Sequence, residues 1–465
     1  MKALLLTPPA PRLWNPATAE EDLLPSKTWV PLGIAYLTSA LRANAVETVF
    51  RDLHRETWPE VAALLERERP DLVGISCFTL GRINADRLAS EARRVLPEAR
   101  IVVGGPHATF FPEHVLANPA VDVVVLGEGE ETIVELVACF ERGGDLADVP
   151  GLALRTGNGV VRTRARERST DLDGLAFPAY DAFDLAEYKS PEIPERYRDL
   201  VGTHILSSRG CPFHCGFCSV NRFFEGRWSR RSPANVADEV ERLITDLGVG
   251  HVYFSDDLFT LDRQRILDLC REISDRGLRF AWMAETRVDL VDAELLARMR
   301  EAGCYRIYYG VESGSPRVLK AANKGFTADQ VREAFAKTHE AGIEPCCFLM
   351  VGNPGETPET IEETVALIRE IRPATMPILG INTLLPASPQ YDRAKEAGLI
   401  SDGYWLGGDA PPPYTLEHDV DDLIYLQMLL TRGIAPQVYE QLCAMGFDEK
   451  YFLMRRMAKG MDRRA

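Results

Sequence analysis

The sequence predicts an α/β protein with two sheets and a mostly helical C-terminal region, and three observations carry this prediction. Short apolar runs alternate with helical patterns from residue 1 to about 145, and the same alternation returns at 201–385. A segment rich in charge, proline and glycine, 146–200, separates the two. Alternation of this kind is typical of parallel sheets covered by helices, and 465 residues suffice for two or three domains.

The first segment, 1–145, is predicted to be a doubly wound, Rossmann-like domain. Its expected strands are the apolar runs at 2–7, 47–53, 72–78, 100–105 and 122–130. Ligands in this architecture bind beyond the carboxyl ends of the strands. Ser76, Gly104 and Gly105 fall at such ends, and so does the "GEGEE" segment at 127–131.

Residues 146–200 are interpreted as a linker that packs on both neighbours, with one hairpin near 157–159. Residues 201–385 are predicted to form a partial (β/α)6 barrel, because six strand–helix units are too few to close an eight-unit barrel. Its expected strands are 203–208, 251–257, 279–285, 306–312, 344–352 and 376–385. Residues 386–465 are expected to be mostly helical, with a proline-rich break at 407–415.

Composition argues against several classes of partner. The formal net charge is −16, with 53 basic and 69 acidic residues, which disfavours a nucleic-acid partner bound by bulk electrostatics. No apolar run approaches the roughly 20 residues that a membrane span needs, so we expect no membrane partner. Ten cysteines without a disulfide-like framework favour a reducing, cytoplasmic environment.

Three cysteines are clustered in "SSRGCPFHCGFCSV", where Cys211, Cys215 and Cys218 have C-x3-C-x2-C spacing. Structural zinc usually takes four protein ligands, often as paired C-x2-C knuckles. A zinc site completed by His214 or a distant residue is therefore the weaker interpretation. Three thiolates turned inward near glycine and proline suit an iron–sulfur cube with one open corner. The other seven cysteines are most simply small core residues.

This spacing, with Phe217 just before the last cysteine and after the first strand of a partial barrel, resembles the radical S-adenosylmethionine (radical SAM) superfamily. The resemblance implies that the three cysteines hold three irons of a [4Fe–4S] cluster, and that SAM chelates the fourth. Reductive cleavage of SAM in the family gives a 5′-deoxyadenosyl radical, which abstracts hydrogen from a substrate. The protein orients the reactants and excludes water.

Other barrel segments also resemble family patterns: "YFSDDLFT", "GVESGS", "FLMVGNPGET" and "LLPASPQYDRAKEAGLI". In the last of these, Ala387–Ser388 stands where Gly-Thr is usual. The resemblance implies SAM contacts from Phe217, Ser255, Asp256, Asp257, Arg287, Glu312, Ser313, Val351 and Gly352. The two aspartates suit the methionine amino group, and the arginine suits a carboxylate. Each carboxylate taken alone is as readily a helix N-cap or a turn acceptor, and no catalytic acid or base is assigned.

Residues 1–145 resemble the cobalamin-binding domain that precedes the barrel in one radical SAM subfamily. The matching pieces are "TPP", "WVPLGIAYLTSAL", "DLVGIS", "VVGGPHATFFPE" and "VDVVVLGEGEET". The resemblance implies cobalamin contacts, where a corrinoid binds, from Thr7, Pro8, Ser76, Gly104, Gly105, Gly127, Glu128 and Gly129.

The loop "TPPAPRLWNP" lacks the histidine that ligates cobalt in many cobalamin proteins, so we expect no histidine ligand on cobalt. His54, in "DLHRET", is interpreted as a lone surface histidine. The alternative is that the domain is a retained scaffold without a corrinoid.

Three functions remain open. The first is cobalamin-dependent C-methylation of a small, natural-product type substrate, which uses two SAM molecules. The second is radical dehydration, deoxygenation or rearrangement of a diol or aminosugar (aminoglycoside-type) substrate without cobalamin; the acidic composition is compatible with a cationic substrate. The third, a non-catalytic cluster protein, would normally have a fourth cysteine. Either enzyme needs an electron donor, such as flavodoxin, ferredoxin or an NADPH-dependent reductase.

Overall fold

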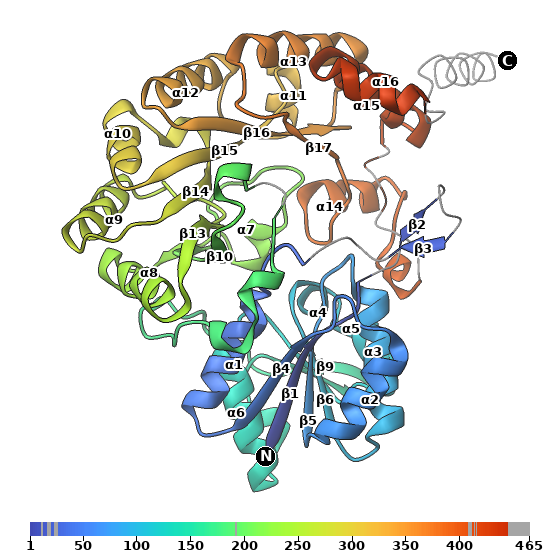
Figure 1. The fold of residues 1–465 in the computed structure, drawn as a ribbon. Helices are drawn as coiled ribbons and strands as arrows, with labels where there is room; N and C mark the ends of the chain where they lie inside the picture. Colours follow the sequence, from blue (N-terminus) through green and yellow to red (C-terminus); the bar gives the residue numbers. More distant parts are fainter. Residues whose placement is uncertain are drawn as a thin grey trace, which may run out of the picture.

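Two mainly parallel sheets frame the protein, one in each half of the chain (Figure 1). The computed structural model describes residues 1–10, 13–15, 20–22, 27–190, 193–407, 412, 414 and 416–444. The expected helical region at 386–465 therefore extends, from residue 445 onward, outside the described residues. Within the described ranges, no helix combines the length and the apolar character needed to cross a lipid bilayer.

The first sheet has seven strands in the order β4-β1-β5-β6-β7-β8-β9. The strands β4, β1, β5, β6 and β7 are parallel, as predicted. Their bounds are β1 (Lys2–Thr7), β4 (Glu47–Asp52), β5 (Leu72–Ser76), β6 (Arg100–Gly104) and β7 (Val123–Val125). A short antiparallel pair, β2 (Leu13–Asn15) and β3 (Glu20–Asp22), lies apart from this sheet.

The strands of this sheet are buried on both faces, which explains their unbroken apolar runs. In β1, Leu4 and Leu6 pack into one core and Ala3 and Leu5 pack into the other. The first core includes α2 (Trp58–Glu68), α3 (Arg82–Val95) and α5 (Pro112–Ala117), and the second includes α1 (Leu32–Ala43) and α6 (Glu130–Arg142). A short helix, α4 (Pro106–Phe110), follows β6.

The predicted hairpin near 157–159 is confirmed, and it extends the first sheet. Strand β8 (Leu152–Thr156) pairs antiparallel with β7, and β9 (Gly159–Arg162) pairs antiparallel with β8. This part of the segment interpreted as a linker thus belongs to the first sheet. Its pairing rests on the buried Leu152 and Ala153, which are too few apolar residues to reveal a strand of the first domain from the sequence.

The second sheet contains six strands, all parallel and adjacent in chain order, as expected for a partial barrel. They are β10 (Val201–Ile205), β13 (Val249–Phe254), β14 (Ala281–Thr286), β15 (Cys304–Glu312), β16 (Glu344–Val351) and β17 (Ile378–Ile381). The helices that follow them lie on the outer side of the curved sheet (Figure 1). These helices are α8 (Pro233–Leu247), α9 (Arg263–Asp275), α10 (Ala293–Glu301), α12 (Ala328–Glu340) and α13 (Pro358–Ile371).

Side chains alternate between the two faces of the barrel sheet. Phe254, Trp282 and Tyr309 belong to the large core that includes the outer helices. Tyr253 and Tyr308 belong to a separate cluster on the other face of the sheet. Short elements link the strands: β11 (Ser208–Arg209), α7 (Val220–Phe223), β12 (Ser229–Arg230) and α11 (Pro316–Ala321).

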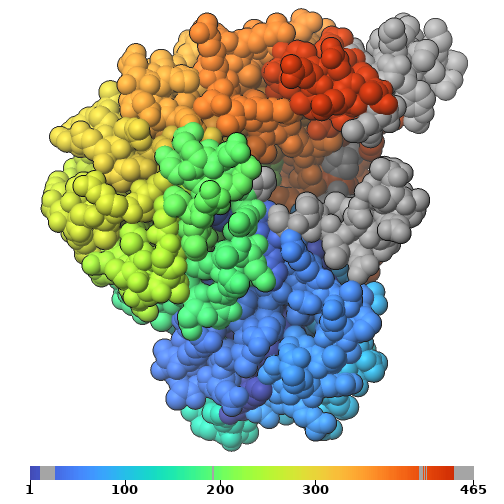
Figure 2. Space-filling model, viewed as in Figure 1, coloured from blue at the N-terminus to red at the C-terminus, as the bar shows by residue number. Residues whose placement is uncertain are grey.

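The C-terminal region contacts both halves. Helix α15 (Val420–Ile434) packs on α13 and on α16 (Pro436–Ala444), and α14 (Pro389–Glu396) precedes them. Trp405 is fully buried, and its ring lies 5.6 Å from Phe111 of the first half. Arg82, also in the first half, donates a hydrogen bond to the Gly407 carbonyl at 3.2 Å. Figure 2 shows the two halves in contact across a broad boundary.

Candidate functional site

A cavity of about 450 Å³ lies between the two halves, at the carboxyl ends of both sheets. Ser76 and Gly104, at the ends of β5 and β6, line it from the first half. His204, Arg209 and Ser255 line it from the barrel. Because strand ends from both domains meet here, the cavity occupies the position where each architecture places its ligands.

The wall from the first half is built mainly of backbone and apolar side chains. Gly127 has φ +69°, and a Cβ built on it meets no atom within 4 Å. Gly105 has φ +108°, and a Cβ there would stand 2.9 Å from the Cys77 carbonyl oxygen. Glycine is therefore required at position 105 by the turn, while glycine at 127 keeps the wall flat. A flat, largely apolar wall fits a wide planar ring such as a corrin.

Six of the eight residues predicted to contact cobalamin line this cavity: Ser76, Gly104, Gly105, Gly127, Glu128 and Gly129. The other two, Thr7 and Pro8, are not among its lining residues. The Thr7 hydroxyl donates to Asp52 at the end of β4. His54 is half-buried rather than a surface histidine, because its loop packs back on the first strand's loop through the Ala10 amide, 3.1 Å from the His54 carbonyl.

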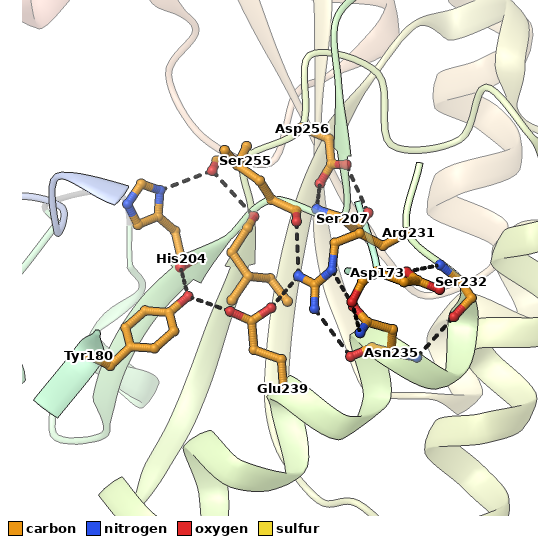
Figure 3. A network of polar contacts seen from close by, with 12 residues as sticks. Asp173, Tyr180, His204, Ser207, Arg231, Ser232, Asn235, Glu239, Ser255 and Asp256 are labelled. Atoms are coloured by element: carbon orange, nitrogen blue, oxygen red, sulfur yellow. Dashed lines mark hydrogen bonds and ion pairs between the residues drawn. The ribbon is translucent and has the colours of Figure 1, made fainter. Parts of the chain in front are cut away.

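The residues that line the cavity include one histidine, His204, and both of its ring nitrogens have hydrogen-bond partners. Nε2 lies 2.6 Å from the Val30 carbonyl and Nδ1 lies 2.9 Å from Ser255 Oγ (Figure 3). Burial lowers the pKa of His204 to about 4, so the ring is neutral at pH 7. Nε2–H therefore donates to Val30, and Nδ1 accepts from the Ser255 hydroxyl.

The cysteine loop follows β11, and its three cysteines are all partly exposed. Backbone bonds pin the loop from two sides. The Gly216 amide donates to the Ala322 carbonyl at 2.9 Å, and the Gln390 amide donates to the Gly216 carbonyl at 2.9 Å. Asn221 Nδ2 also donates to the Cys211 carbonyl at 3.1 Å. The loop is thus fixed by segments far from it in the chain.

The chemistry of the three thiols fits a bound cationic cluster. Burial raises the pKa of Cys211 to about 12 and that of Cys218 to about 11, and the neighbouring cysteines add to both shifts. Thiolates here need iron to balance their charge. Within the described part, no three His, Cys, Asp or Glu side chains are gathered closely enough to hold a metal ion. The assignment of an iron–sulfur cluster to this loop rests on its C-x3-C-x2-C spacing.

Two cations flank the cysteine loop. The Arg287 guanidinium lies 3.8 Å from the Phe213 ring centroid and pairs through Nε and Nη2 with Asp289, both at 2.9 Å. Its Nη1 is buried without a hydrogen-bond partner among the described residues. Lys324 Nζ lies 5.5 Å from the Phe217 ring centroid. An unpaired guanidinium N–H next to the loop fits a carboxylate of a bound small molecule.

The carboxylates predicted to bind SAM lie in different settings. Asp257 accepts from the Gly210 amide at 3.1 Å, and desolvation among the surrounding protein atoms, together with the nearby Asp256, raises its pKa to about 6. Asp256 is fully buried and accepts from Ser207 and Ser208. Glu312 has φ +66° and its Oε1 lies 3.1 Å from Lys324 Nζ.

The remaining predicted residues divide in the same way. The structure brings Phe217, Asp257, Arg287 and Glu312 around the cysteine loop. Ser255 instead faces the cavity between the halves. Ser313 is buried, with its hydroxyl 3.1 Å from that of Thr364.

Val351 and Gly352 lie at the end of β16, and an amide chain connects them to the cysteine loop. Asn382 Nδ2 donates to the Gly352 carbonyl at 3.3 Å and to Gln390 Oε1 at 2.6 Å. Gln390 in turn bonds Gly216 through its backbone.

A buried polar network holds the end of β10, from which the cysteine loop departs (Figure 3). Arg231 pairs with Glu239, and the two side chains are only 4% and 1% exposed. Tyr180 donates to Glu239 Oε1 at 2.9 Å and contacts the His204 carbonyl at 3.1 Å. Asp256 accepts from the Ser207 hydroxyl at 2.8 Å. Asp256 therefore stabilises the stem of the cysteine loop.

Sequence reasoning missed Arg209, Lys324 and Gln390. Each touches the site through a contact with a residue that lies far along the chain, so local patterns give little sign of it. The one available signal is that Arg209 stands two positions before Cys211 in "SRGC".

Comparison with known families agrees with this geometry. Residues 205–368 match the Radical SAM superfamily, and residues 25–137 match the B12 binding domain. "Uncharacterized methyltransferase PH0819" of Pyrococcus horikoshii is 33% identical over 374 residues, which are 80% of this chain and 78% of that protein.

Two other curated relatives carry different activities in their names. The "Anaerobic magnesium-protoporphyrin IX monomethyl ester cyclase" of Cereibacter sphaeroides is 33% identical, over 81% of this chain and 62% of its own length. The "Cytidylyl-2-hydroxyethylphosphonate methyltransferase" of Streptomyces wedmorensis is 28% identical, over 87% of this chain and 79% of its own length.

Among solved structures, the fold resembles the radical S-adenosylmethionine methyltransferase TsrM from Kitasatospora setae. The TM-score is 0.68 with 23% sequence identity, and the match covers 89% of this chain and 80% of that one.

Proposed function

The chain belongs to the radical SAM superfamily, in the group with a B12-binding domain ahead of the barrel, and from this premise we propose that it is a cobalamin-dependent C-methyltransferase acting on a small molecule. The observation that carries the proposal is the cavity between the halves, since one space is lined by the glycine-rich wall and by the stem of the cysteine loop. This lining supports a radical generator and a methyl carrier on opposite sides of one substrate volume.

The family's groups fit the residues present. Cys211, Cys215 and Cys218 would hold the [4Fe–4S] cluster, and the wall that includes Gly104 and Gly127 would seat the corrinoid. When bound, the cluster and SAM supply a 5′-deoxyadenosyl radical, and the corrinoid supplies a methyl group to a substrate carbon.

The chain's own residues bind and orient SAM in this proposal. Arg287 offers its free Nη1–H to the methionine carboxylate, and its stacking on Phe213 keeps the guanidinium beside the cysteine loop. Asp257, which is exposed beside Gly210, accepts from the ammonium group. The salt bridge between Glu312 and Lys324 holds both charged groups near Phe217.

The barrel also fixes the polarity of the cavity. His204 is neutral and its Nδ1 accepts from the Ser255 hydroxyl, so Ser255 Oγ can act only as an acceptor toward a ligand in the cavity. No side chain is assigned as a catalytic acid or base. Radical transfer between carbon centres needs none, and positioning with exclusion of water is the protein's main contribution.

Radical dehydration without cobalamin is not favoured. The relatives described above carry methyltransferase or cyclase activities in their names, and a B12-binding domain matches most of the first half. Each cavity-facing carboxylate of Glu128 and Glu130 is paired with an arginine, so the wall offers little free negative charge to a polycationic aminosugar.

The proposal includes an external one-electron donor of the flavodoxin, ferredoxin or NADPH-dependent reductase class, and a cytoplasmic location. Reduction of the cluster requires a low-potential donor, and such donors operate in the reducing cytoplasm. The substrate itself is a small molecule whose identity depends on the part of the cavity left beside the corrinoid and SAM.

The test measures two products of SAM. Methyl donation leaves S-adenosylhomocysteine, whereas radical formation leaves 5′-deoxyadenosine and methionine. The reduced, cluster-loaded protein with hydroxocobalamin is expected to form both nucleosides from SAM, and omission of cobalamin is expected to abolish only S-adenosylhomocysteine. Formation of 5′-deoxyadenosine alone, with cobalamin present and bound, would contradict the methyltransferase proposal and favour a cyclase-like or eliminating reaction.

A further inference from the structure

Arg209, in the stem of the cysteine loop, contacts the first half of the chain, which contains the glycine wall. Its Nη1 donates to Glu128 Oε1 at 2.7 Å, and its Nη2 donates to Glu130 Oε1 at 2.7 Å. Its guanidinium lies 4.8 Å from the Tyr36 ring centroid. The Arg209 side chain is 10% exposed, and its two acidic partners are 18% and 12% exposed. Both arms of one buried guanidinium are therefore used across the domain boundary.

Arg168, from the segment between the domains, closes the same group. Its Nε donates to Glu128 Oε2 at 3.0 Å, and its Nη2 donates to the Arg209 carbonyl at 2.9 Å. Its Nη1 donates to the Arg227 carbonyl at 3.1 Å, and its side chain is 7% exposed. Two arginines and two glutamates balance in charge, and three parts of the chain meet in one cluster.

This group of two arginines and two glutamates has short, stiff connections to both candidate cofactor sites. Only Gly210 separates Arg209 from Cys211; Gly210 has φ +88°, and a Cβ on it would lie 2.3 Å from the Arg227 carbonyl oxygen. On the other side, Glu128 stands between Gly127 and Gly129, which line the cavity between the halves. Displacement of this Arg–Glu group therefore moves the start of the cysteine loop and the glycine wall together.

The Arg–Glu group also separates two neighbouring cavities. Glu128, Glu130 and Arg209 line both the cavity of about 450 Å³ and a second cavity of about 230 Å³ at the same boundary. Opening the cluster would leave buried charges without partners, which is strongly unfavourable, so partly open arrangements are disfavoured. A group that is stable when closed and disfavours partial opening is suited to act as a two-state element, and such an element can carry coupling between two sites.

We propose that Arg209, with Glu128, Glu130 and Arg168, forms an interdomain latch that couples the two cofactor sites. A cysteine loop ordered by its iron–sulfur cluster closes the latch and tightens corrinoid binding. The bound corrinoid in turn stabilises the iron–sulfur cluster. Arg209 acts as a positioning residue through its neighbours and needs no contact with either group. The inference rests on the binding of both groups that the proposed function requires, and it is independent of methyl transfer. Coupling of this kind is reciprocal by thermodynamic necessity.

The test compares the dissociation constant of hydroxocobalamin, followed by its visible spectrum, for the iron-free and the cluster-loaded full-length protein. In the wild type, loading the cluster is expected to tighten cobalamin binding by roughly 10-fold, within the usual range of coupling between sites. Arg209→Gln should reduce this ratio to about one. The double variant Arg209→Gln/Glu130→Gln removes one charge of each sign and keeps the Arg168–Glu128 pair, so it leaves none of these buried charges unpaired and should fold and also show a ratio near one.

Glu131→Gln is the matched control, because Glu131 follows Glu130 on α6 but is 57% exposed and pairs with Arg166, which is not part of the latch. It should keep the wild-type ratio. A wild-type ratio retained in both Arg209 variants, or a ratio of one in a wild type that binds both groups, overturns the latch alone. Absence of corrinoid binding by the wild type in both forms overturns the latch together with the proposed function.

Discussion

The two walls of the cavity between the halves are built on opposite principles. The barrel wall, lined by His204, Arg209 and Ser255, works through what is present, because two flanking cations and a buried network around Asp256 hold the cysteine loop that departs from this wall. The wall from the first half works through what is missing, since the glycines at 104 and 127 leave its surface without side chains.

The difference teaches which changes each wall tolerates. A site made of specific side chains is sensitive to the removal of any one of them, whereas a site made of backbone and space is sensitive to the addition of atoms. Substitutions that remove a side chain from the barrel wall and substitutions that add one to the glycine wall are therefore the two kinds of variant that distinguish the cofactor sites.

The largest effect is expected for Cys215→Ala. Loss of one of three protein ligands should reduce the iron content of the reconstituted protein to near zero and lower SAM cleavage by more than ~10³-fold, because the open-corner cube cannot be held by two thiolates. Iron and 5′-deoxyadenosine assays check this. Cys443→Ala, a partly exposed cysteine on α16, is the matched control and should leave both values unchanged. Full iron content in Cys215→Ala would contradict the assignment of the loop.

Glu239→Gln should follow in size. The change leaves the Arg231 charge buried and unpaired below the cysteine loop, so the free energy of unfolding should fall by about 3 kcal/mol. Urea unfolding followed by circular dichroism measures the loss. Glu301→Gln breaks only an exposed pair with Arg298, and it should cost less than about 0.5 kcal/mol. Equal effects of the two variants would show that the buried network does not hold the barrel wall.

Gly104→Leu tests the glycine wall. A Cβ at this position meets only Val125 atoms, the nearest at 3.6 Å, so the backbone accepts a side chain whose outer atoms occupy the cavity. Corrinoid affinity should fall on the order of 100-fold, while iron content stays at the wild-type level. Gly157→Leu, in the β8–β9 turn with open space around it, is the control. Wild-type corrinoid affinity in Gly104→Leu would place the corrinoid elsewhere.

The smallest effect concerns Glu356, which is buried behind the end of β16 and accepts from the Gly352 and Asn353 amides. Burial raises its pKa to about 7, above the value of 4.5 for an ordinary glutamate. Between these values the folded state binds more protons than the unfolded state, so stability falls as pH rises from about 4.5 to 7.

Glu356→Gln keeps an acceptor oxygen for both amides but cannot ionise. The difference in unfolding free energy between the wild type and this variant should therefore shift against the wild type by about 1 kcal/mol per pH unit across that window. Urea unfolding at pH 5, 6 and 7 measures it. A difference that is flat with pH would mean that Glu356 titrates normally.

Much of the fold was predictable because its signals are local. Apolar runs and helical periodicity predicted two parallel sheets, and the strand-end rule pointed to Ser76, Gly104 and Gly127, all of which line the cavity. The cysteine spacing is likewise a local pattern.

Contacts that depend on packing were not predictable. In "SDD", Ser255 faces the cavity, Asp256 is enclosed and Asp257 is exposed, and only the surrounding elements decide among three adjacent polar residues. The β8–β9 hairpin was predicted, but its pairing with β7 of the first sheet was not, because its exposed residues resemble those of a linker. Arg209 and Lys324 contact Glu128 and Phe217, which lie on distant segments and which no short motif encodes.

The most direct test of the account is the metal content of a single preparation. The protein would be reconstituted anaerobically with iron and sulfide, incubated with hydroxocobalamin, desalted, and assayed for iron and cobalt beside its visible spectrum. The account predicts about four irons and about one cobalt per chain, with a spectrum that lacks histidine ligation. About four irons without retained cobalt would contradict it, because the glycine-lined cavity would then be a scaffold and the methyl carrier would be absent.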